Sequence, residues 1–538
     1  MTGIGLRPRS PAARLALILL AALGVRLGLF FHGVRGSDAY AYAREAAALA
    51  RGEYDPFRLG ADWYGYRYTV VAPTALAYRL FGVGDWPSAL WPLLCGLGAI
   101  AVVFGLAREI FAADDTALWS ALVFATLPLS IATSTGLGPD SFIPVLSGLA
   151  VLALLRAERT PSAGARAGWL GLMGLAFYAC VSARIVSVIL VLFFGGYCLL
   201  APGRRLRRLA GASLALGLPL AAEAATYLWV TGDPLRQWHE VAPSLTALTA
   251  VSITGLAYYP RAMLGLDVAG FARFSFFFYL VLAGAVLGLA SAPRVVAVPL
   301  LWLVPVLGYL EFGSISPSRY VPIHKAYQYL SLITVPGALL AGYGVSRLAR
   351  ARLPRGGARL AAAALAALLV LSSLYGTYAI RRRSDDDARP YRVVHDALAR
   401  APVRPVWVHH FRWKLFLEYF FRYQRLDIRM VAGDGRPPRD AYLVVHDRYL
   451  YWTTTGQPIA RAPGRPAYTQ EHERLPEYLF APPEEWRLLE EFTDQYGRMR
   501  LFFIPAESAP GRDRERGPAA RDRARRSSQS RAPSRENS

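Results

Sequence analysis

The stretch GLGPDSFIPVLSGLAVLALLRA, residues 136–157, decides the fold class of this chain. Between Asp140 and Arg156 it contains no charged residue, and the stretch is about as long as the helix that a membrane's hydrocarbon core requires. A Gly-Pro turn with an acid precedes it and an arginine ends it, as expected where a helix leaves the lipid. We therefore expect a membrane-spanning helix at about residues 139–156.

Similar apolar segments recur along most of the 538 residues. The chain is 54% hydrophobic and only 18% charged, whereas soluble globular proteins carry about 25% charged residues. The sequence predicts an α-helical polytopic membrane protein with about eleven transmembrane helices. We expect these helices at roughly residues 14–33, 86–108, 116–134, 139–156, 167–181, 184–201, 209–230, 272–291, 295–311, 327–346 and 360–380.

The net charge of +22 invites a nucleic-acid function, but its distribution argues against one. Much of the excess lies in the N-terminus and in the basic loops near 156–166, 203–208 and 347–359. If the N-terminus is cytoplasmic, eleven spans place all three loops on the cytoplasmic side, as the positive-inside rule requires. The charge therefore indicates membrane topology, and we expect no nucleic-acid partner. Arg26 interrupts the first apolar span, which favours a membrane anchor over a cleaved signal.

The residues after the last span differ in pattern from those before it. We expect a membrane domain over 1–381, a small soluble α/β domain over 382–508 and a disordered basic tail over 509–538. Strands are predicted in PVWVHH, DIRMV and AYLVVHD, a helix in FRWKLFLEYFFRYQ, and two strands joined by a glycine turn in WRLLEEFTDQYGRMRLFFI. The odd number of spans places this C-terminal domain outside the cytoplasm.

Two acids occupy connections on the predicted outer face. Ser37 or Asp38 can cap a helix that ends at Gly52, and Asp140 lies in the first turn of the span quoted above. Capping is a sufficient explanation for each acid alone. However, both lie at the same membrane surface, where an ionisable group is costly unless it is solvated or paired. This favours carboxylates that face a polar substrate.

Cations share the predicted outer face. They are Arg67, Arg184, Arg319, His324 and Lys325. Lys325 is notable because the chain contains only one other lysine, Lys414. A single arginine at this depth commonly extends to lipid headgroups, but the cluster near residue 319 suits a phosphate or diphosphate ester. Glu223, inside the seventh span, is interpreted as a helix-packing partner.

Five stretches together resemble the GT-C glycosyltransferases, specifically family 39-like bacterial members related to protein O-mannosyltransferases and aminoarabinose transferases. They are DAYAYAREAAALARG, YRYTVVAPTALAYRLFG, GLGPDSFIPVLSGLAVLALLRA, GLAFYACVSARIVSVILVLF and SRYVPIHKAYQYLSLITVPGALLAGYG. The resemblance extends over about residues 1–380, and it depends on the order of these motifs on one face. Many relatives carry an Asp-Glu pair where this chain has Asp38 and Ala39.

The resemblance implies an enzyme that moves a sugar from a polyprenyl-phosphate carrier to an acceptor hydroxyl, with inversion, on the extracytoplasmic side. It implies Asp38 as the base and Asp140 as the group that orients the acceptor or a metal ion. The cations Arg67, Arg184, Arg319, His324 and Lys325 would contact the donor phosphate, and Tyr42 and Tyr320 would support the acceptor. A divalent metal ion is a possible cofactor, and no other cofactor is expected.

Several alternatives stay open at this point. A transporter or flippase would need ionisable residues near the membrane midplane, and Glu223 is the one candidate. A ligase or polymerase that uses a diphosphate-linked glycan, or a purely structural scaffold, are the others. The expected location is a bacterial cytoplasmic membrane, with membrane lipids as partners and a protein, lipid or glycan as acceptor.

Overall fold

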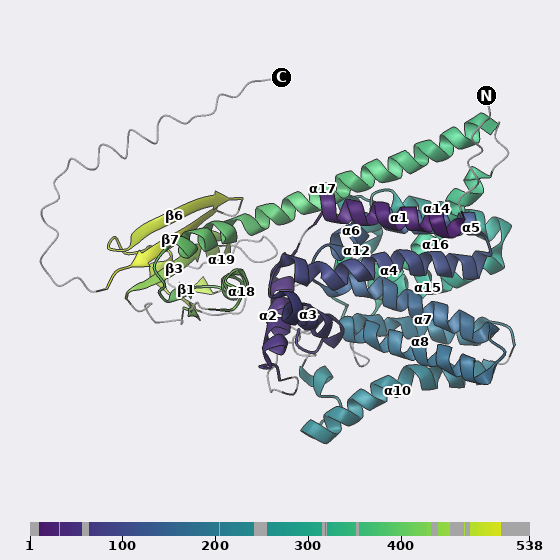
Figure 1. The fold of residues 1–538 in the computed structure, drawn as a ribbon, viewed down its shortest axis with the longest axis horizontal. Coiled ribbons are helices and arrows are strands. Elements are labelled where there is room, and N and C mark those ends of the chain that lie inside the picture. Colours follow the sequence, from purple (N-terminus) through teal and green to yellow (C-terminus); the bar gives the residue numbers. More distant parts are fainter. Residues whose placement is uncertain are drawn as a thin grey trace, which may run out of the picture. The chain divides into compact units, whose positions relative to one another are not determined.

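The structure is a computed structural model, shown in Figure 1. It describes residues 10–31, 33–55, 57, 64–203, 205–240, 255–314, 318, 320–350, 355–424, 427–431, 439–451, 467–468, 474–495 and 497–506. The chain divides into two compact units. The first comprises Met1–Arg389 with Glu418–Gln424, and the second comprises Pro390–Leu417 with Arg425–Ser538. The predicted tail, 509–538, lies outside the described residues.

The first unit is built from helices. They are α1 (Pro11–Gly24), α2 (Ser37–Arg51), α3 (Tyr68–Phe81), α4 (Asp85–Phe111), α5 (Asp114–Thr126), α6 (Pro128–Ser134), α7 (Phe142–Arg159), α8 (Ala163–Ala183), α9 (Val191–Leu200), α10 (Arg205–Thr231), α12 (Tyr258–Met263), α13 (Val268–Phe274), α14 (Phe277–Ser291), α15 (Pro293–Phe312) and α16 (Ser331–Ala349). Short 3₁₀ turns lead into α7, α9 and α16. α17 (Arg355–Arg400) contributes residues to both units.

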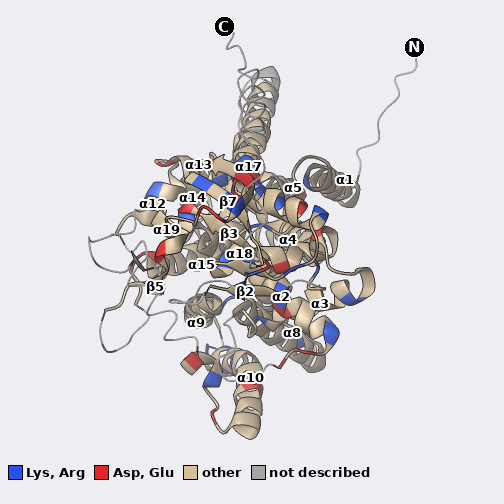
Figure 2. Cartoon of the chain, turned by 90° about the vertical axis from the view of Figure 1, so that its left-hand side faces the viewer, with Lys and Arg blue, Asp and Glu red and all other residues tan. Residues whose placement is uncertain are grey.

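Among the described residues, seven helices are long and apolar enough to cross a membrane, or nine if two bent pairs each form one span. The bent pairs are α5 with α6 and α13 with α14. The other two of the eleven predicted spans correspond to the shorter apolar segment Ile185–Leu200 and to part of α17. In Figure 2, most of the membrane-helix ribbon is tan, which marks residues other than Lys, Arg, Asp and Glu. The helical membrane fold that the sequence predicted is confirmed.

α16 is the central helix of this unit, and every residue from Ser331 to Ser346 is buried. Glycines allow its neighbours to approach closely. A Cβ on Gly284 of α14 would lie 1.9 Å from the carbonyl oxygen of Leu340, and a Cβ on Gly342 would lie 2.2 Å from Oγ of Ser120 in α5. Small residues at helix contacts are typical of membrane proteins, because van der Waals packing replaces the hydrophobic effect there.

Arg26 explains the break between α5 and α6. Pro128 begins α6, and the two helices meet at 63°. The fully buried guanidinium of Arg26 donates hydrogen bonds to Ala125 O (3.3 Å), to Ser130 Oγ (3.2 Å) and to Ser134 Oγ (2.8 Å). Buried polar groups in a membrane protein need such partners. The arginine that interrupts the first span therefore holds the bent pair in place.

The second unit contains a five-stranded sheet in the order β2-β1-β3-β7-β6. Its strands are β1 (Val406–Val408), β2 (Ile428–Met430), β3 (Ala441–His446), β6 (Arg487–Asp494) and β7 (Gly497–Ile504), and α18 is Phe411–Phe420. β1 pairs in parallel with β2 and β3, whereas β7 pairs antiparallel with β3 and β6. The predicted strands and helix therefore form, and β3 is buried along its whole length.

Candidate active site

The helix α2 presents Asp38 at the predicted outer end of the first unit. α2 ends at Gly52 as predicted, with φ of 76°. The predicted cap is wrong, because Gly36 is the N-cap residue and makes no side-chain cap hydrogen bond. Asp38 instead lies exposed in the first turn, where its Oδ1 accepts a hydrogen bond from Tyr64 Oη at 2.7 Å. Its carboxylate is therefore accessible and oriented by a phenol.

Arg67 lies beside this carboxylate, immediately before α3. Its Nη1 donates to Tyr42 Oη, and its guanidinium lies over the rings of Tyr42 (5.4 Å) and Tyr64 (5.7 Å). Tyr42 is fully buried and meets Tyr64 edge to face. Burial lowers the pKa of Arg67 to about 10, so the side chain stays charged at neutral pH. Aromatic rings thus hold a cation close to Asp38.

Asp140 and Arg184 form an ion pair between two separate helix ends. Asp140 lies in the 3₁₀ turn that starts the α7 span, and Arg184 follows the last residue of α8. Nη2 of Arg184 lies 3.0 Å from Oδ1 and 3.1 Å from Oδ2 of Asp140. Both side chains are about nine-tenths buried. The Arg184 guanidinium also lies over the ring of Tyr329, 5.1 Å from its centroid.

The acids and cations described above lie in one region of the first unit. Asp38, Arg67, Asp140, Arg184 and His324 lie close enough to influence one another electrostatically, and we call them the acid–arginine cluster. Burial and then the positive charge of Arg184 lower the pKa of His324, so its ring is neutral at pH 7 and can donate one hydrogen bond. The cluster joins residues that are up to 286 positions apart in the sequence, from 38 to 324.

Lys325 is engaged in a different contact. Its Nζ lies 2.7 Å from Oε1 of Glu311 and 3.0 Å from Gly255 O, and both charged side chains are almost fully buried. Oε2 of Glu311 accepts from the backbone amide of Tyr259. Consecutive side chains of an extended segment point to opposite sides, which is consistent with His324 facing the cluster while Lys325 faces Glu311.

Two other predicted site residues and the metal remain to be placed. Tyr320 is 62% exposed, and Arg319 lies outside the described residues. Within the part of the chain that the structure describes, no three His, Cys, Asp or Glu side chains gather as metal ligands do. The role of a metal ion, of Tyr320 and of Arg319 therefore stays a prediction.

Sequence reasoning missed three residues of this region. Tyr64 contacts the carboxylate of Asp38, and Tyr329 contacts the guanidinium of Arg184. Tyrosines are frequent near membrane surfaces, so they give no specific signal in the sequence. Glu311 had one available signal. It ends an otherwise apolar span 14 residues before the rare Lys325, and a buried acid of this kind requires a partner.

Comparison with known proteins finds a family that part of the chain resembles. Residues 71–229, which include Asp140 and Arg184, match the family described as dolichyl-phosphate-mannose-protein mannosyltransferase. Over these residues the chain is similar to this family of membrane glycosyltransferases. The resemblance inferred from the motifs is thereby confirmed, and so is the prediction that the chain is a glycosyltransferase. No curated protein sequence matches the chain.

Solved structures of glycosyltransferases share the fold. ArnT from Cupriavidus metallidurans in the apo state superposes with a TM-score of 0.58 at 16% identity, over 91% of this chain and 97% of ArnT. ArnT bound to undecaprenyl phosphate gives 0.57 at 15% identity, with the same coverage. The apo oligosaccharyltransferase of Archaeoglobus fulgidus gives 0.51 at 12% identity, over 89% of this chain and 79% of that protein. At these identities the likeness shows the fold.

Proposed function

We propose that this glycosyltransferase moves a sugar from a polyprenyl-phosphate carrier to an acceptor hydroxyl at the extracytoplasmic membrane surface. The observation that carries the proposal is the convergence of two carboxylates and two arginines at one end of a membrane helix bundle. The donor has a lipid tail and a phosphate leaving group, and this end of the membrane helix bundle offers two fixed guanidiniums. The relative bound to undecaprenyl phosphate supports the same donor class.

Arg67, Arg184 and His324 are the proposed phosphate contacts. When the bond between the anomeric carbon and the phosphate oxygen breaks, negative charge develops on the departing polyprenyl phosphate. Two positioned guanidiniums stabilise that charge, and the neutral His324 adds a hydrogen-bond donor. The pair of Lys325 with Glu311 fixes the segment that carries His324, so we assign Lys325 a positioning role.

Asp38 is the proposed base. It is exposed and reachable, whereas the carboxylate of Asp140 already pairs with Arg184 at 3.0 Å. Asp38 takes the proton of the acceptor hydroxyl as the acceptor oxygen bonds to the anomeric carbon. Because a single carboxylate is accessible in the acid–arginine cluster, a covalent sugar–enzyme step has no second group to serve it. We therefore propose one displacement with inversion, in which Asp140 orients Arg184 and the acceptor.

A transfer assay with the purified chain tests this function. The protein in lipid nanodiscs would receive polyprenyl-phosphate donors that carry different labelled sugars, together with an extract of envelope proteins, lipids and glycans. We expect free polyprenyl phosphate and a covalently labelled acceptor in equal amounts. In proteoliposomes, donor that crosses the bilayer intact, without transfer, would identify a transporter and contradict the proposal.

A further inference from the structure

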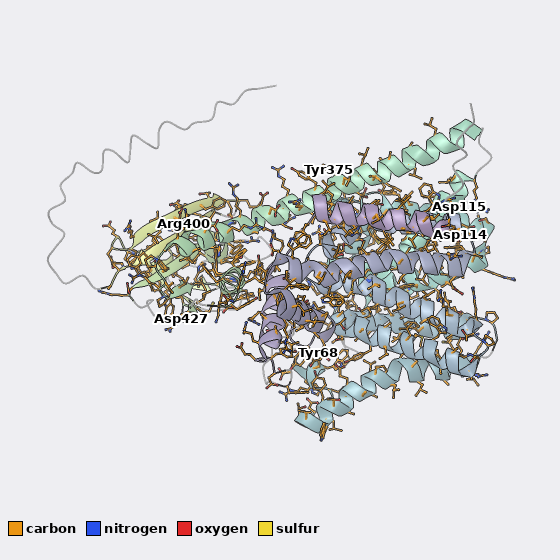
Figure 3. All side chains as sticks on the ribbon, in the orientation of Figure 1. Tyr68, Asp114, Asp115, Tyr375, Arg400 and Asp427 are labelled. Carbon is orange, nitrogen blue, oxygen red and sulfur yellow. The ribbon has the colours of Figure 1, made fainter. Side chains whose placement is uncertain are left out.

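A second charged hollow lies at the end of the bundle opposite to the acid–arginine cluster. It is a cavity of about 380 Å³ between α7, α8 and the start of α10, lined by Leu154, Ala157, Glu158, Ala163, Arg166, Ala167, Leu170, Arg207, Arg208 and Gly211. Arg166 lies near the start of α8 and Arg184 follows its end, which places them about 27 Å apart along the helix axis. In Figure 3, Tyr68, next to Arg67, is labelled at one end of the bundle, and Asp114 and Asp115 at the other.

The packing of α8 on α10 explains why this cavity exists. At Gly174 the two helices approach so closely that a Cβ would lie 1.9 Å from the carbonyl oxygen of Ala215. Nearer the helix ends, the facing positions are Ala163, Ala167 and Gly211, whose side chains are too small to fill the space. The cavity therefore results from the small side chains at the contact between α8 and α10.

The charges that line the cavity are unbalanced. Arg208 pairs with Glu158 (2.8 Å) and also donates to the carbonyls of Ala201 and Pro202. Arg166 donates one hydrogen bond, to Thr160 O at 2.9 Å. Arg207 is exposed, and no carboxylate among the described residues pairs with it. Two lining guanidiniums are thus left without a counter-charge, and they point to an anionic ligand.

Apolar residues in and next to the cavity indicate that the anionic ligand is a lipid. Leu154 and Leu170 line the cavity. Further along the same face of α10, Leu214 and Leu218 are 69% and 65% exposed in a helix apolar enough to span a membrane. Basic pockets between membrane helices bind the headgroups of anionic lipids. We propose that this cavity binds the phosphate headgroup of an anionic membrane lipid, with its acyl chains along α10.

Native mass spectrometry of the purified, delipidated full-length chain tests this site. We expect phosphatidylglycerol to bind at least tenfold more tightly than phosphatidylcholine. Arg166→Gln and Arg207→Gln should each weaken phosphatidylglycerol binding by about fivefold, because one lipid-facing cation contributes roughly that much. Arg205→Gln is the matched control, since it removes a charge from the same turn of α10 but does not line the cavity.

Three results would overturn the proposal. One is equal weakening by the Arg205→Gln control, which would mean that only general surface charge attracts the lipid. Another is competition by millimolar inorganic phosphate that displaces phosphatidylglycerol completely, which would identify a free-phosphate site. The third is equal affinity for phosphatidylcholine. Sugar transfer by Arg207→Gln in detergent should match the wild type, so failure of the lipid site is distinguishable from failure of the proposed function.

Discussion

Two buried ion pairs of the first unit have different consequences for chemistry. Arg184 pairs with Asp140 yet keeps one face on Tyr329 within the acid–arginine cluster. Lys325 pairs with Glu311 and is almost fully enclosed. Both cations are paired, but Arg184 keeps 12% of its side chain exposed whereas Lys325 keeps 1%, so a substrate phosphate can approach Arg184 more closely. At the residue scale, the enclosure of each paired cation therefore decides its role.

Replacement of Arg67 should weaken donor binding. Arg67→Gln removes a charged contact to the donor phosphate, which is worth about 1.5–3 kcal/mol. We therefore expect the KM for the donor to rise by about tenfold or more, and donor titrations of sugar transfer would measure it. Arg51→Gln is the control, because this exposed arginine pairs with Glu53 at the far end of α2. Equal effects of the two substitutions would argue against a phosphate contact by Arg67.

Lys325 and Glu311 should behave as a structural pair. Lys325→Met leaves a buried carboxylate without its partner, which costs about 3–5 kcal/mol of stability. Adding Glu311→Leu should restore most of that loss and leave the donor KM near the wild-type value. Thermal unfolding and donor titration of the single and double variants would measure both effects. If the double variant were stable but still bound donor poorly, Lys325 would have to contact the phosphate directly.

The sequence was sufficient to select individual residues of the candidate site, but it did not show which of them pair with one another. It selected Asp38, Asp140, Arg67 and Arg184 because acids and cations on one predicted face suit a phosphate ester. It gave no means to pair Asp140 with Arg184, since contacts between distant loops depend on helix packing. Lys325 illustrates the same limit, because it lies in a connecting segment and its partner Glu311 lies in α15.

At the scale of helices, hydropathy predicted where the spans lie, but it did not predict where a span bends. Each predicted span corresponds to a helix or a bent pair, because an apolar run long enough to cross lipid has few alternatives. The predicted segment 116–134 appears as α5 and α6, which meet at 63°. Pro128 was visible in the sequence, but the partner that stabilises the bend, Arg26, comes from a different helix.

The contact of α14 with α16 gives a test of helix packing. Gly284→Ala would place a Cβ against the backbone carbonyl of Leu340, and such overpacking costs about 1–3 kcal/mol. We expect a lower unfolding temperature for the purified protein. The control is Gly308→Ala in α15, where a Cβ meets no atom within 4 Å; it should be neutral or slightly stabilising. Equal unfolding temperatures for both variants would contradict the close contact.

At the scale of the whole molecule, the order of spans followed by an α/β sheet could be predicted from periodicity alone. Apolar runs give the membrane helices, and short alternating segments give β1, β3, β6 and β7. The sheet order β2-β1-β3-β7-β6 could not be predicted, because strand pairing depends on contacts distant in sequence. The interior of this second unit also holds three buried histidines, His409, His410 and His446.

The buried histidines predict acid sensitivity of the second unit. Burial lowers the pKa of His409 from 6.5 to about 4, while its Nδ1 donates to Val444 O. The folded state therefore binds this proton less tightly than the unfolded chain. Stability should fall as pH drops below about 6.5 and level off below about 4, a loss of about 3 kcal/mol from this residue.

Hydrogen exchange in the peptides that contain β1 and β3 would measure this effect. His409→Gln should reduce the acid-induced rise in exchange between pH 6.5 and 4. His395→Gln, on α17 and outside the buried group, is the control and should behave as the wild type. Identical acid profiles for all three proteins would contradict the assignment to His409.

The most direct test of the whole account compares turnover and donor binding in Asp38→Asn. Removal of a general base lowers the rate by about 10²–10⁴-fold without removing the arginines that hold the donor. We predict that kcat falls by at least 100-fold while the Kd for the polyprenyl-phosphate sugar is unchanged. Glu53→Gln, just after the other end of α2, should retain full activity. Normal turnover by Asp38→Asn would contradict the account.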